Sequence, residues 1–383
     1  MRFLSLLFAL APAGGVFALW PQPRSLETGS TALKLASNFD IHANVQHAPS
    51  DLSAAISRTI SFLKNDKLGR LVVGRGSSDS GALKEAKTLE TLQLSLSEGA
   101  TVRSITEEAR GTIGTRSEEY VLSIPADGSA ATLTANSTLG LFRGLTTFTQ
   151  LFYEWSGQIY TVEAPISITD APAYPWRGFM LDTSRNFFPV ADIKRTLDAM
   201  SLVKMSQFHW HVTDSQSFPL VIPGFTELAE AGAYDPSMIY SPSDVEDIVD
   251  YASARGIDVM VEIDTPGHTM IISASHPEYV ACAEASPWTT YSEPPAGQLR
   301  LASPDATSFT AEMLAAVARM FPSTLMSTGG DELNTNCYAQ DAETQEDLKS
   351  AGQTLEQALD VFTQKTHAAI EAVGKTPAVW EGM

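Results

Sequence analysis

The chain has 383 residues, of which 44% are hydrophobic and 18% charged, and its formal net charge is −20 at pH 7. This length is sufficient for two domains and a sizeable apolar core. The negative charge disfavours nucleic acids and anionic membranes as partners, because phosphate binding requires clustered lysine and arginine. We therefore predict a globular protein with no nucleic-acid partner and no membrane partner.

The first residues have the pattern of a secretory signal. Arg2 precedes an apolar run at residues 3–10, and a region of small residues ends at Ala18. This arrangement favours a signal peptide over residues 1–18, cleaved after Ala18. A membrane anchor is the alternative, but the run is too short to cross a bilayer. We expect a secreted or extracellular protein, or one delivered to a vacuolar or lysosome-like compartment.

Two further features, a pair of cysteines and an N-glycosylation triplet, are consistent with secretion. Cys282 and Cys337 are the two cysteines of the chain, and in an oxidising compartment they are candidates for one disulfide. The sequence pattern alone does not show that they meet. Asn136 begins the acceptor triplet Asn-Ser-Thr, so we predict N-glycosylation at Asn136.

Residues 19–172 predict a small α+β domain with a structural role. Alternating apolar residues or short apolar runs indicate strands at 71–73, 91–96, 119–124 and 131–135. Helical periodicity is present at 52–64 and 140–152. Few side chains in this region are candidates for catalysis, so we expect it to pack against the region that follows.

The residues 170–175 contain two prolines, which favours a boundary there, and residues 173–383 have a different rhythm. Apolar runs at 178–181, 207–212, 258–263, 325–326 and 378–380 alternate with helical patterns at 190–205, 243–255, 309–320 and 355–373. Alternating strands and helices indicate a parallel sheet. We predict an α/β fold, in which the N-terminal α+β domain precedes a (β/α)8 TIM-type barrel.

The alternative is an open doubly wound sheet. Such a sheet usually carries a Gly-rich phosphate turn after its first strand, and the sequence has none. Groups at the carboxyl ends of successive strands are instead typical of a barrel. About five of the eight strand–helix units are present, so the expected barrel is incomplete and its two edge strands would be left unpaired. We expect this chain alone to be unstable for that reason.

Polar and aromatic groups follow the predicted strands. They are Asp182, Asp214, Asp264, His268, Asp331, Glu332, Trp380 and Glu381, and Arg177 lies next to the first strand. Asp331 and Glu332 are adjacent after Gly329-Gly330 and should point to different sides, so we expect them to perform different tasks. A solvated acidic turn is the alternative interpretation of this pair. We expect Asp182 and Asp264 to be structural.

Two chemistries fit such a constellation. His209 and His211 lie on one face of a strand and could serve a metal hydrolase, although they could equally form hydrogen bonds at a strand end. Glycoside hydrolysis requires a proton donor and a negative group beside an oxocarbenium-like centre. Paired acids with an aromatic residue and an arginine suit the second chemistry better. We therefore predict no metal and no cofactor.

Four ordered motifs carry a resemblance to a known family. They are W-R-G-F-M-L-D-T-S-R at 176–185, H-W-H-V-T-D at 209–214, D-T-P-G-H at 264–268 and G-G-D-E at 329–332. With them, the chain resembles secreted, fungal-type β-N-acetylhexosaminidases of glycoside hydrolase family 20, from about residue 20 to its end. The region before the barrel resembles the family's small α/β domain.

The resemblance implies a substrate-assisted retaining mechanism, in which the 2-acetamido oxygen of the substrate attacks the anomeric carbon. Glu332 matches the general acid/base, and Asp331 matches the residue that orients the acetamido N–H. Arg177 matches an arginine that binds hydroxyls of the non-reducing sugar, which implies an exo-acting enzyme; the alternative is that Arg177 pairs with an acid of the core. Trp380 matches a wall of the acetamido pocket.

The resemblance also implies supporting features. Asp214 and His268 match a polar relay behind the acid, and Cys282 and Cys337 match a disulfide across the loops after the third and fourth strands. Substrates would be chitooligosaccharides or glycans with terminal N-acetylglucosamine or N-acetylgalactosamine, and members are often homodimers. The family's further barrel units have no counterpart before Met383, which leaves two hypotheses: an exo-β-N-acetylhexosaminidase, or a non-catalytic, C-terminally truncated remnant of one.

Overall fold

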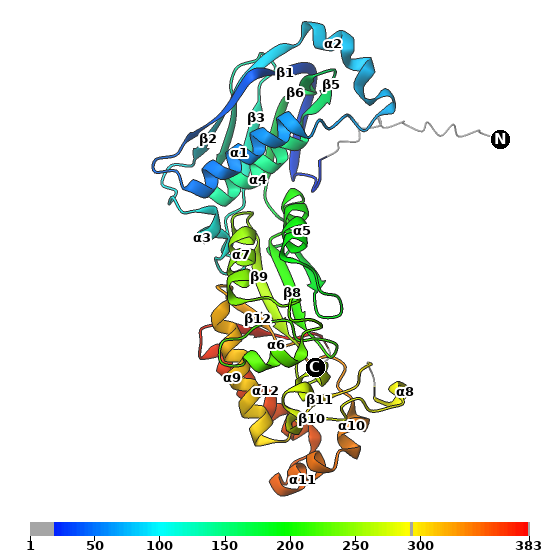
Figure 1. Cartoon of the computed structure of the whole chain (residues 1–383). Helices are drawn as coiled ribbons and strands as arrows, with labels where there is room; N and C mark the ends of the chain where they lie inside the picture. The colour runs from blue at the N-terminus through cyan, green and yellow to red at the C-terminus, as the bar shows by residue number, and fades with distance from the viewer. Residues whose placement is uncertain (1–18, 292–293, 382–383) are drawn as a thin grey trace, which may run out of the picture.

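The computed structural model describes residues 19–291 and 294–381, so the predicted signal peptide lies outside the described residues. Two separate sheets organise the chain, and each has its own cluster of buried hydrophobic side chains. Figure 1 shows the two parts one above the other, with the first sheet at the top.

The first sheet has six strands in the order β1-β2-β4-β3-β6-β5. Its strands are β1 (Ser25–Asn44), β2 (Lys87–Leu96), β3 (Tyr120–Ile124), β4 (Ala131–Ala135), β5 (Tyr153–Trp155) and β6 (Gln158–Asp170). Helices α1 (Ser50–Asn65) and α4 (Thr138–Gln150) lie side by side across one face of this sheet (Figure 1). Their apolar sides close the first core, as the predicted helical periodicity requires.

Two expectations for this region were wrong or incomplete. Residues 71–73 form no strand: Leu71 and Val73 are 76% and 100% exposed, and the 3-10 helix η1 (Val73–Asp79) begins there. The long strands β1 and β6 were not predicted. Much of β1 is exposed and its apolar residues do not alternate regularly, whereas β6 does alternate between buried and exposed residues from Ala164 to Asp170, a signal that was missed. Their pairing with each other, antiparallel from Ser25 to Lys34, supplies the stability that the local pattern does not indicate.

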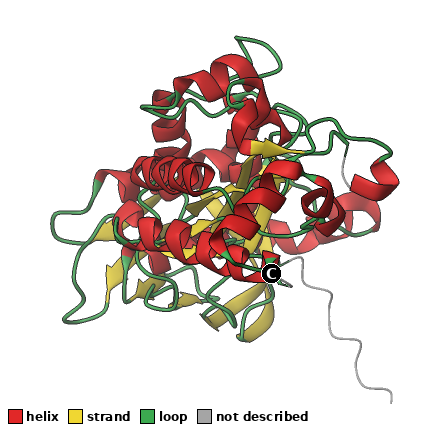
Figure 2. Cartoon of the chain, turned by 90° about the horizontal axis from the view of Figure 1, so that it is seen from below, coloured by secondary structure: helices red, strands yellow, loops and turns green. Residues whose placement is uncertain are grey.

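The second sheet has five strands in the order β13-β12-β9-β8-β7, and neighbouring strands pair in parallel. The strands are β7 (Gly178–Asp182), β8 (Gln207–Thr213), β9 (Asp258–Ile263), β12 (Leu325–Ser327) and β13 (Thr376–Ala378). The helices between them are α5 (Val190–Leu202), α7 (Pro242–Ser253), α9 (Pro304–Met320) and α12 (Leu355–Glu371). The predicted strand–helix alternation is confirmed, and Figure 2 shows helices gathered around the strands.

Shorter elements fill the connections. They are α2 (Ser80–Glu85), α3 (Ile105–Ala109), α6 (Thr226–Gly232), η2 (Met270–Ala274), η3 (Pro277–Tyr279), β10 (Val280–Ala281), α8 (Trp288–Tyr291), β11 (Gln298–Leu299), α10 (Thr335–Gln340) and α11 (Ala342–Ala351). None of the helices in the described ranges combines the length and the apolar character that a membrane crossing demands.

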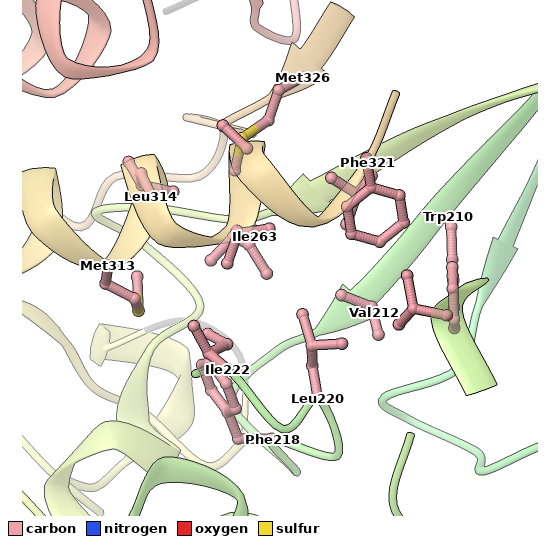
Figure 3. Close-up of a cluster of buried hydrophobic side chains, with 14 of the residues drawn as sticks. Trp210, Val212, Phe218, Leu220, Ile222, Ile263, Met313, Leu314, Phe321 and Met326 are labelled. Carbon is pink, nitrogen blue, oxygen red and sulfur yellow. The ribbon is translucent and has the colours of Figure 1, made fainter. Parts of the chain in front are cut away.

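The two faces of β8 serve different purposes. Trp210 and Val212 point into the apolar core with Phe218, Met313 and other side chains of the surrounding elements (Figure 3). Because successive side chains of a strand alternate, His209 and His211 lie on the opposite face, which is the inner side of the curved sheet. The same alternation sets Glu262 of β9 apart from the apolar residues beside it. Polar groups are therefore gathered on one face of an otherwise apolar sheet.

Buried ion pairs join the first region to the amino ends of these strands. Arg116 reaches Asp258 at 3.1 Å, Lys204 pairs with Asp170 at 3.0 Å, and Arg177 pairs at 2.5 Å with Glu118, which also binds Arg143 of the first region at 2.7 Å. We call these pairs, together with Arg177, the amino-end charge cluster. Removing one partner of a buried pair leaves an uncompensated charge, so the cluster fixes where the first region meets the sheet.

Candidate active site

The candidate site lies at the carboxyl ends of β8, β9 and β12, where parallel strands bring their following residues together. Asp214 follows β8, Asp264 and His268 follow β9, and Asp331 and Glu332 follow β12. Asp214, Asp264 and His268 are all buried. The sequence pattern thus identified five groups that the fold gathers at one end of the sheet.

The Gly329-Gly330 turn is required by the close approach of β9. Gly329 has a φ of 66°, and a β carbon on it would overlap the carboxyl group of Asp264. The N–H of Gly330 donates to Asp264 Oδ1 at 2.9 Å. This turn delivers Asp331 and Glu332 to the mouth of the sheet.

The adjacent acids lie in different environments. Asp331 Oδ1 is buried and has no hydrogen-bond partner among the described residues, which is a costly state for a carboxylate oxygen. The side chain of Glu332 is 62% exposed. Glu332 also has a φ of 56°, a left-handed conformation that is strained for a residue with a side chain. Backbone strain of this kind is concentrated at functional sites.

A chain of acids and imidazoles leads inward from Glu332. His268 Nε2 lies 3.2 Å from Glu332 Oε2, and His268 Nδ1 lies 3.3 Å from Asp214 Oδ1. Burial alone would raise the pKa of Asp214, but hydrogen bonds from His211 and His268 hold it below its ordinary value. A carboxylate behind an imidazole fixes the orientation of the ring and stabilises its protonated form.

Asp264 differs from Asp214 in its protonation. Burial raises the pKa of Asp264 to about 8, and repulsion from Asp331 and Glu262 acts in the same direction. Asp264 is therefore a neutral acid at neutral pH. Its Oδ1 atom holds the Gly330 N–H, so it supports the turn that carries the two acids, in agreement with a structural assignment.

The two histidines of the His-Trp-His segment face carboxylates. Glu262 lies 2.5 Å from His209 Nε2 through Oε2 and 2.7 Å from His211 Nδ1 through Oε1. His211 Nε2 faces Asp214 Oδ2 at 2.8 Å. Sequence reasoning missed Glu262, although a single acid inside the apolar run of β9 was a usable signal.

Trp380 lies on the same inner face. Its indole N–H donates to Glu262 Oε1 at 3.0 Å, and its ring stacks on His209 with centroids 5.3 Å apart. Its backbone N–H donates to the carbonyl of Gly329 at 3.0 Å, which ties it to the turn before Asp331. The residue is 37% exposed, so one side of the ring is free to meet a ligand.

The assignment of Arg177 to substrate binding was wrong. Arg177 precedes β7, and its side chain bonds to Glu118 and to the carbonyl oxygens of Lys204, Tyr174 and Pro175. It thus belongs to the amino-end charge cluster. A strand of five residues spans roughly 16 Å, so Arg177 lies at the end of the sheet away from Glu332.

Arg185 is the arginine at the carboxyl end of β7. Its Nη1 atom lies 2.8 Å from Asp182 Oδ2 and 2.8 Å from Asp214 Oδ2, and its Nη2 atom lies 3.1 Å from His268 Nδ1. The sequence carried a signal for it, because Arg185 follows a strand whereas Arg177 precedes one. Asp182 accepts bonds from the N–H groups of Ser184 and Arg185, as a structural strand-end residue does.

Among the described residues, two trios could present ligand atoms to a cation, and both lie inside this site. They are His211, Asp214 and Asp264, and Asp264, His268 and Asp331, with ligand atoms within 4.8 Å of one another. Both imidazoles already hydrogen-bond to Asp214. His209 instead pairs with Glu262. The two histidines of β8 thus belong to hydrogen-bonded networks, as in the interpretation that gave them hydrogen bonds at a strand end.

The disulfide between Cys282 and Cys337 is present, with Cα atoms 5.9 Å apart. It connects the segment after β10 to helix α10, and both cysteines border a pocket that also contains Glu332 and His268. The bond therefore anchors the loops after β9 and β12 beside the site. The pairing that the resemblance implied is confirmed.

Two protein-family models match this chain. Residues 174–383 match the model of the glycosyl hydrolase family 20 catalytic domain, and residues 19–151 match a model described as beta-acetyl hexosaminidase like. The first match alone covers more than half of the chain. The chain belongs to glycosyl hydrolase family 20.

Relatives within family 20 come from fungi, insects and mammals. A beta-hexosaminidase of Arthroderma benhamiae is 40% identical over 69% of this chain and 44% of the relative. A chitooligosaccharidolytic beta-N-acetylglucosaminidase of Bombyx mori is 34% identical over 85% of this chain and 53% of the relative. A beta-hexosaminidase subunit beta of Felis catus is 32% identical over 99% of this chain and 70% of the relative. The chain thus spans about half the length of the first two relatives.

The fold also matches solved family 20 structures. A chitobiase of Flavobacterium johnsoniae aligns with a TM-score of 0.75 and 26% identity over 95% of this chain and 52% of that protein. An exo beta-N-acetylglucosaminidase of Vibrio harveyi aligns with a TM-score of 0.71 and 20% identity, over 95% of this chain and 54% of that protein, which shows the shared fold. The predicted arrangement, an N-terminal domain before a TIM-type catalytic domain, is that of these neighbours.

Proposed function

We propose that the protein is an exo-β-N-acetylhexosaminidase that removes terminal N-acetylglucosamine or N-acetylgalactosamine from chitooligosaccharides or glycans. The observation that carries the proposal is the turn after β12, where a buried Asp331 oxygen without a partner lies next to the exposed, imidazole-linked Glu332. Membership of family 20 supports the same chemistry.

Each acid has a separate task in this proposal. Glu332 donates a proton to the glycosidic oxygen as the bond to the anomeric carbon breaks, and the substrate's acetamido oxygen closes onto that carbon. The free oxygen of Asp331 accepts the acetamido N–H and stabilises the positive charge of the cyclic intermediate. Glu332 then takes a proton from the water that opens this intermediate. No second enzyme nucleophile is required.

The surrounding groups position these acids. His268 and Asp214 hold Glu332 and supply a path along which its proton affinity is set. Trp380 is proposed as a wall of the acetamido pocket, since its ring lies on the inner face with one side accessible. Arg185 takes the place that Arg177 had in the sequence-based assignment, as the guanidinium nearest the acids at the mouth.

The decisive experiment replaces the acids one at a time. Glu332→Gln should lower kcat for a β-N-acetylglucosaminide with a poor leaving group by about 100-fold or more, because general acid catalysis contributes roughly 10²- to 10⁴-fold. Asp331→Asn should slow hydrolysis chiefly for substrates that retain the acetamido group. Turnover by Glu332→Gln close to that of the unmodified protein would refute the assignment.

A thiazoline that mimics the cyclised intermediate separates the two function hypotheses. An active enzyme should bind it far more tightly than the substrate, because it resembles the species that the site stabilises. Tight thiazoline binding without hydrolysis would instead support the non-catalytic relative. Weak binding together with normal hydrolysis would contradict the substrate-assisted mechanism.

We further propose that the mature protein is secreted, carries a glycan on Asn136 and acts as a homodimer. Asn136 is exposed, and the next residue, Ser137, caps helix α4 by accepting from the N–H of Gly140 at 2.9 Å. We also propose a division into residues 19–172 and 173–383, which accords with the two sheets. Mass spectrometry of the secreted protein and sedimentation measurements test the first three proposals.

A further inference from the structure

Glu262 has an unusual set of partners for a fully buried carboxylate. Its Oε2 atom lies 2.5 Å from His209 Nε2 and 2.7 Å from Ser327 Oγ. Its Oε1 atom lies 2.7 Å from His211 Nδ1 and 3.0 Å from Trp380 Nε1. A carboxylate offers about four acceptor sites, and here four donors occupy them. No arginine or lysine is among these four partners.

These bonds determine where the protons of His211 lie. An ionised carboxylate has no proton to donate, so His211 Nδ1 must donate to Glu262. Burial alone would raise the pKa of Glu262, but the bonds from His209 and His211 hold it below its ordinary value. On the other side of the ring, Nε2 faces the carboxylate of Asp214 at 2.8 Å and must donate as well. His211 is therefore an imidazolium between two carboxylates.

The chain of contacts continues to the proposed general acid. From His211 it passes to Asp214, from Asp214 to His268 over 3.3 Å, and from His268 to Glu332 over 3.2 Å. The second branch runs from the same Oε1 atom of Glu262 to Trp380. One buried carboxylate thus touches both the route to Glu332 and the proposed pocket wall.

We propose that Glu262 is a positioning residue that couples the orientation of the general acid to that of Trp380. This inference rests on the proposed function for its catalytic consequence. Glu262 does not reach the substrate. It acts through His211 on the relay and through the indole N–H on the pocket, so that the acid and the acetamido pocket keep their relative positions.

The test is Glu262→Gln, a change of nearly equal size that removes the charge and half of the acceptor capacity. A glutamine has one acceptor oxygen, so only two of the four donors keep an acceptor. Its NH2 group faces the remaining two donors. We expect kcat for an aryl β-N-acetylglucosaminide to fall by about 10- to 100-fold, since small misplacements of a catalytic group cost rates of this order. Thiazoline affinity should fall with it.

The same strand supplies a matched control. Asp258 lies at the other end of β9, is equally buried, and accepts from Arg116 at 3.1 Å, Gln207 at 3.2 Å and Ser323 at 2.8 Å. Asp258→Asn also removes a buried carboxylate from β9, but away from the acids at the mouth. The folded fraction of this variant should keep kcat and thiazoline affinity within about twofold of the unmodified protein, given its distance from the reacting groups.

A readout independent of turnover is the imidazole of His211 in the full chain labelled with 15N-histidine. The unmodified protein and Asp258→Asn should show both ring nitrogens of His211 protonated. Glu262→Gln should shift or remove the Nδ1 proton signal, because a neutral amide replaces the carboxylate that this N–H faces. If the unmodified protein binds thiazoline but does not hydrolyse the glycoside, the proposed activity fails, while the histidine spectra and thiazoline affinities still decide the role of Glu262.

Three results would overturn the inference. One is a Glu262→Gln protein with unchanged His211 signals and thiazoline affinity; another is an equal loss in Asp258→Asn. If Glu262→Gln does not fold, Trp380→Phe keeps an aromatic ring but removes the indole N–H. This variant should shift the Nδ1 proton resonance of His211, because both groups share Oε1 of Glu262. An unshifted resonance is the third contradicting result.

Discussion

The two ends of the second sheet contain the same kind of acids in opposite settings. At the amino end, Asp258 and Glu118 are neutralised by Arg116, Arg143 and Arg177. At the carboxyl end, Glu262 faces His209 and His211, and Asp214 faces His211, His268 and the guanidinium of Arg185. Asp264 is neutral there, and Asp331 keeps one oxygen without a described partner. Strand β9 contributes to both settings, with Asp258 at its amino end and Glu262 toward its carboxyl end.

The two ends differ in the imidazoles that face Asp214 and Glu262 at the carboxyl end. A guanidinium remains charged throughout the range in which proteins function, so an acid beside it is held as a fixed ion pair. An imidazole changes its charge near neutrality and can carry or relay a proton. The amino end therefore fixes the position of the first region against the sheet, and the carboxyl end retains groups whose protons can move.

The largest expected effect is that of removing the guanidinium of Arg185 at the carboxyl end of the sheet. Arg185→Ala should lower kcat/KM by about 100-fold, because the guanidinium holds Asp214 beside the acid and small misplacements cost rates of this order. Steady-state kinetics measures the effect, and urea unfolding should show a smaller change in stability.

Arg177→Ala is the counterpart at the amino end. It should lower the free energy of unfolding by about 1–3 kcal/mol, since Glu118 loses one of its two arginine partners in a buried position. The kcat/KM of the folded protein should stay close to that of the unmodified chain. A loss of turnover without a loss of stability would show instead that Arg177 acts in the active site.

The protonation of Asp264 predicts an effect on stability that depends on pH. Its pKa is raised to about 8 from an ordinary value of 3.8, so the folded state holds this proton more tightly than the unfolded chain does. The stability that it contributes is complete below about pH 4 and disappears as the pH rises through 8. Asp264→Asn is uncharged at every pH and should not show this loss.

Urea unfolding between pH 4.5 and 9 measures this contribution as a difference between the two proteins, which cancels the titration of the other groups. The free energy of unfolding of the unmodified protein should fall relative to that of Asp264→Asn as the pH increases. Parallel curves would show that Asp264 is ionised in the folded state, as an acid of the amino end would be.

The smallest expected effect is that of a chelator. If His211 and Asp214 form a proton relay rather than a ligand set, exhaustive chelation should leave hydrolysis unchanged. The measurement compares kcat/KM before and after treatment, followed by addition of zinc. A loss of activity that zinc restores would favour the metal hydrolase that His209 and His211 first suggested.

Much of the second region followed from sequence periodicity. The strands β8 and β9 agreed with the predicted runs to within a residue, because their apolar residues face a core of helices that have a clear period of their own. Groups after those strands, from Asp214 to Glu332, were predicted to converge because carboxyl ends of parallel strands meet. Local pattern and global fold agree here.

The tertiary structure alone decided the rest. Strand β1 depends on pairing with β6 more than a hundred residues away, and no local period reveals such a partner. Leu71 and Val73 have the composition of a strand but no neighbour to pair with. Strand propensity is realised only where a second strand supplies hydrogen bonds and a packing surface.

The composition of the site shows the same division. The sequence by itself determined which side chains follow the strands, because chain order places Asp331 and Glu332 after β12. Only the folded sheet decided that Arg177 faces Glu118 and that Glu262 accepts hydrogen bonds from β8, β12 and Trp380 at once. Hydrogen bonds act over about 3 Å, and the distances between side chains from separate strands exist only after the sheet has formed.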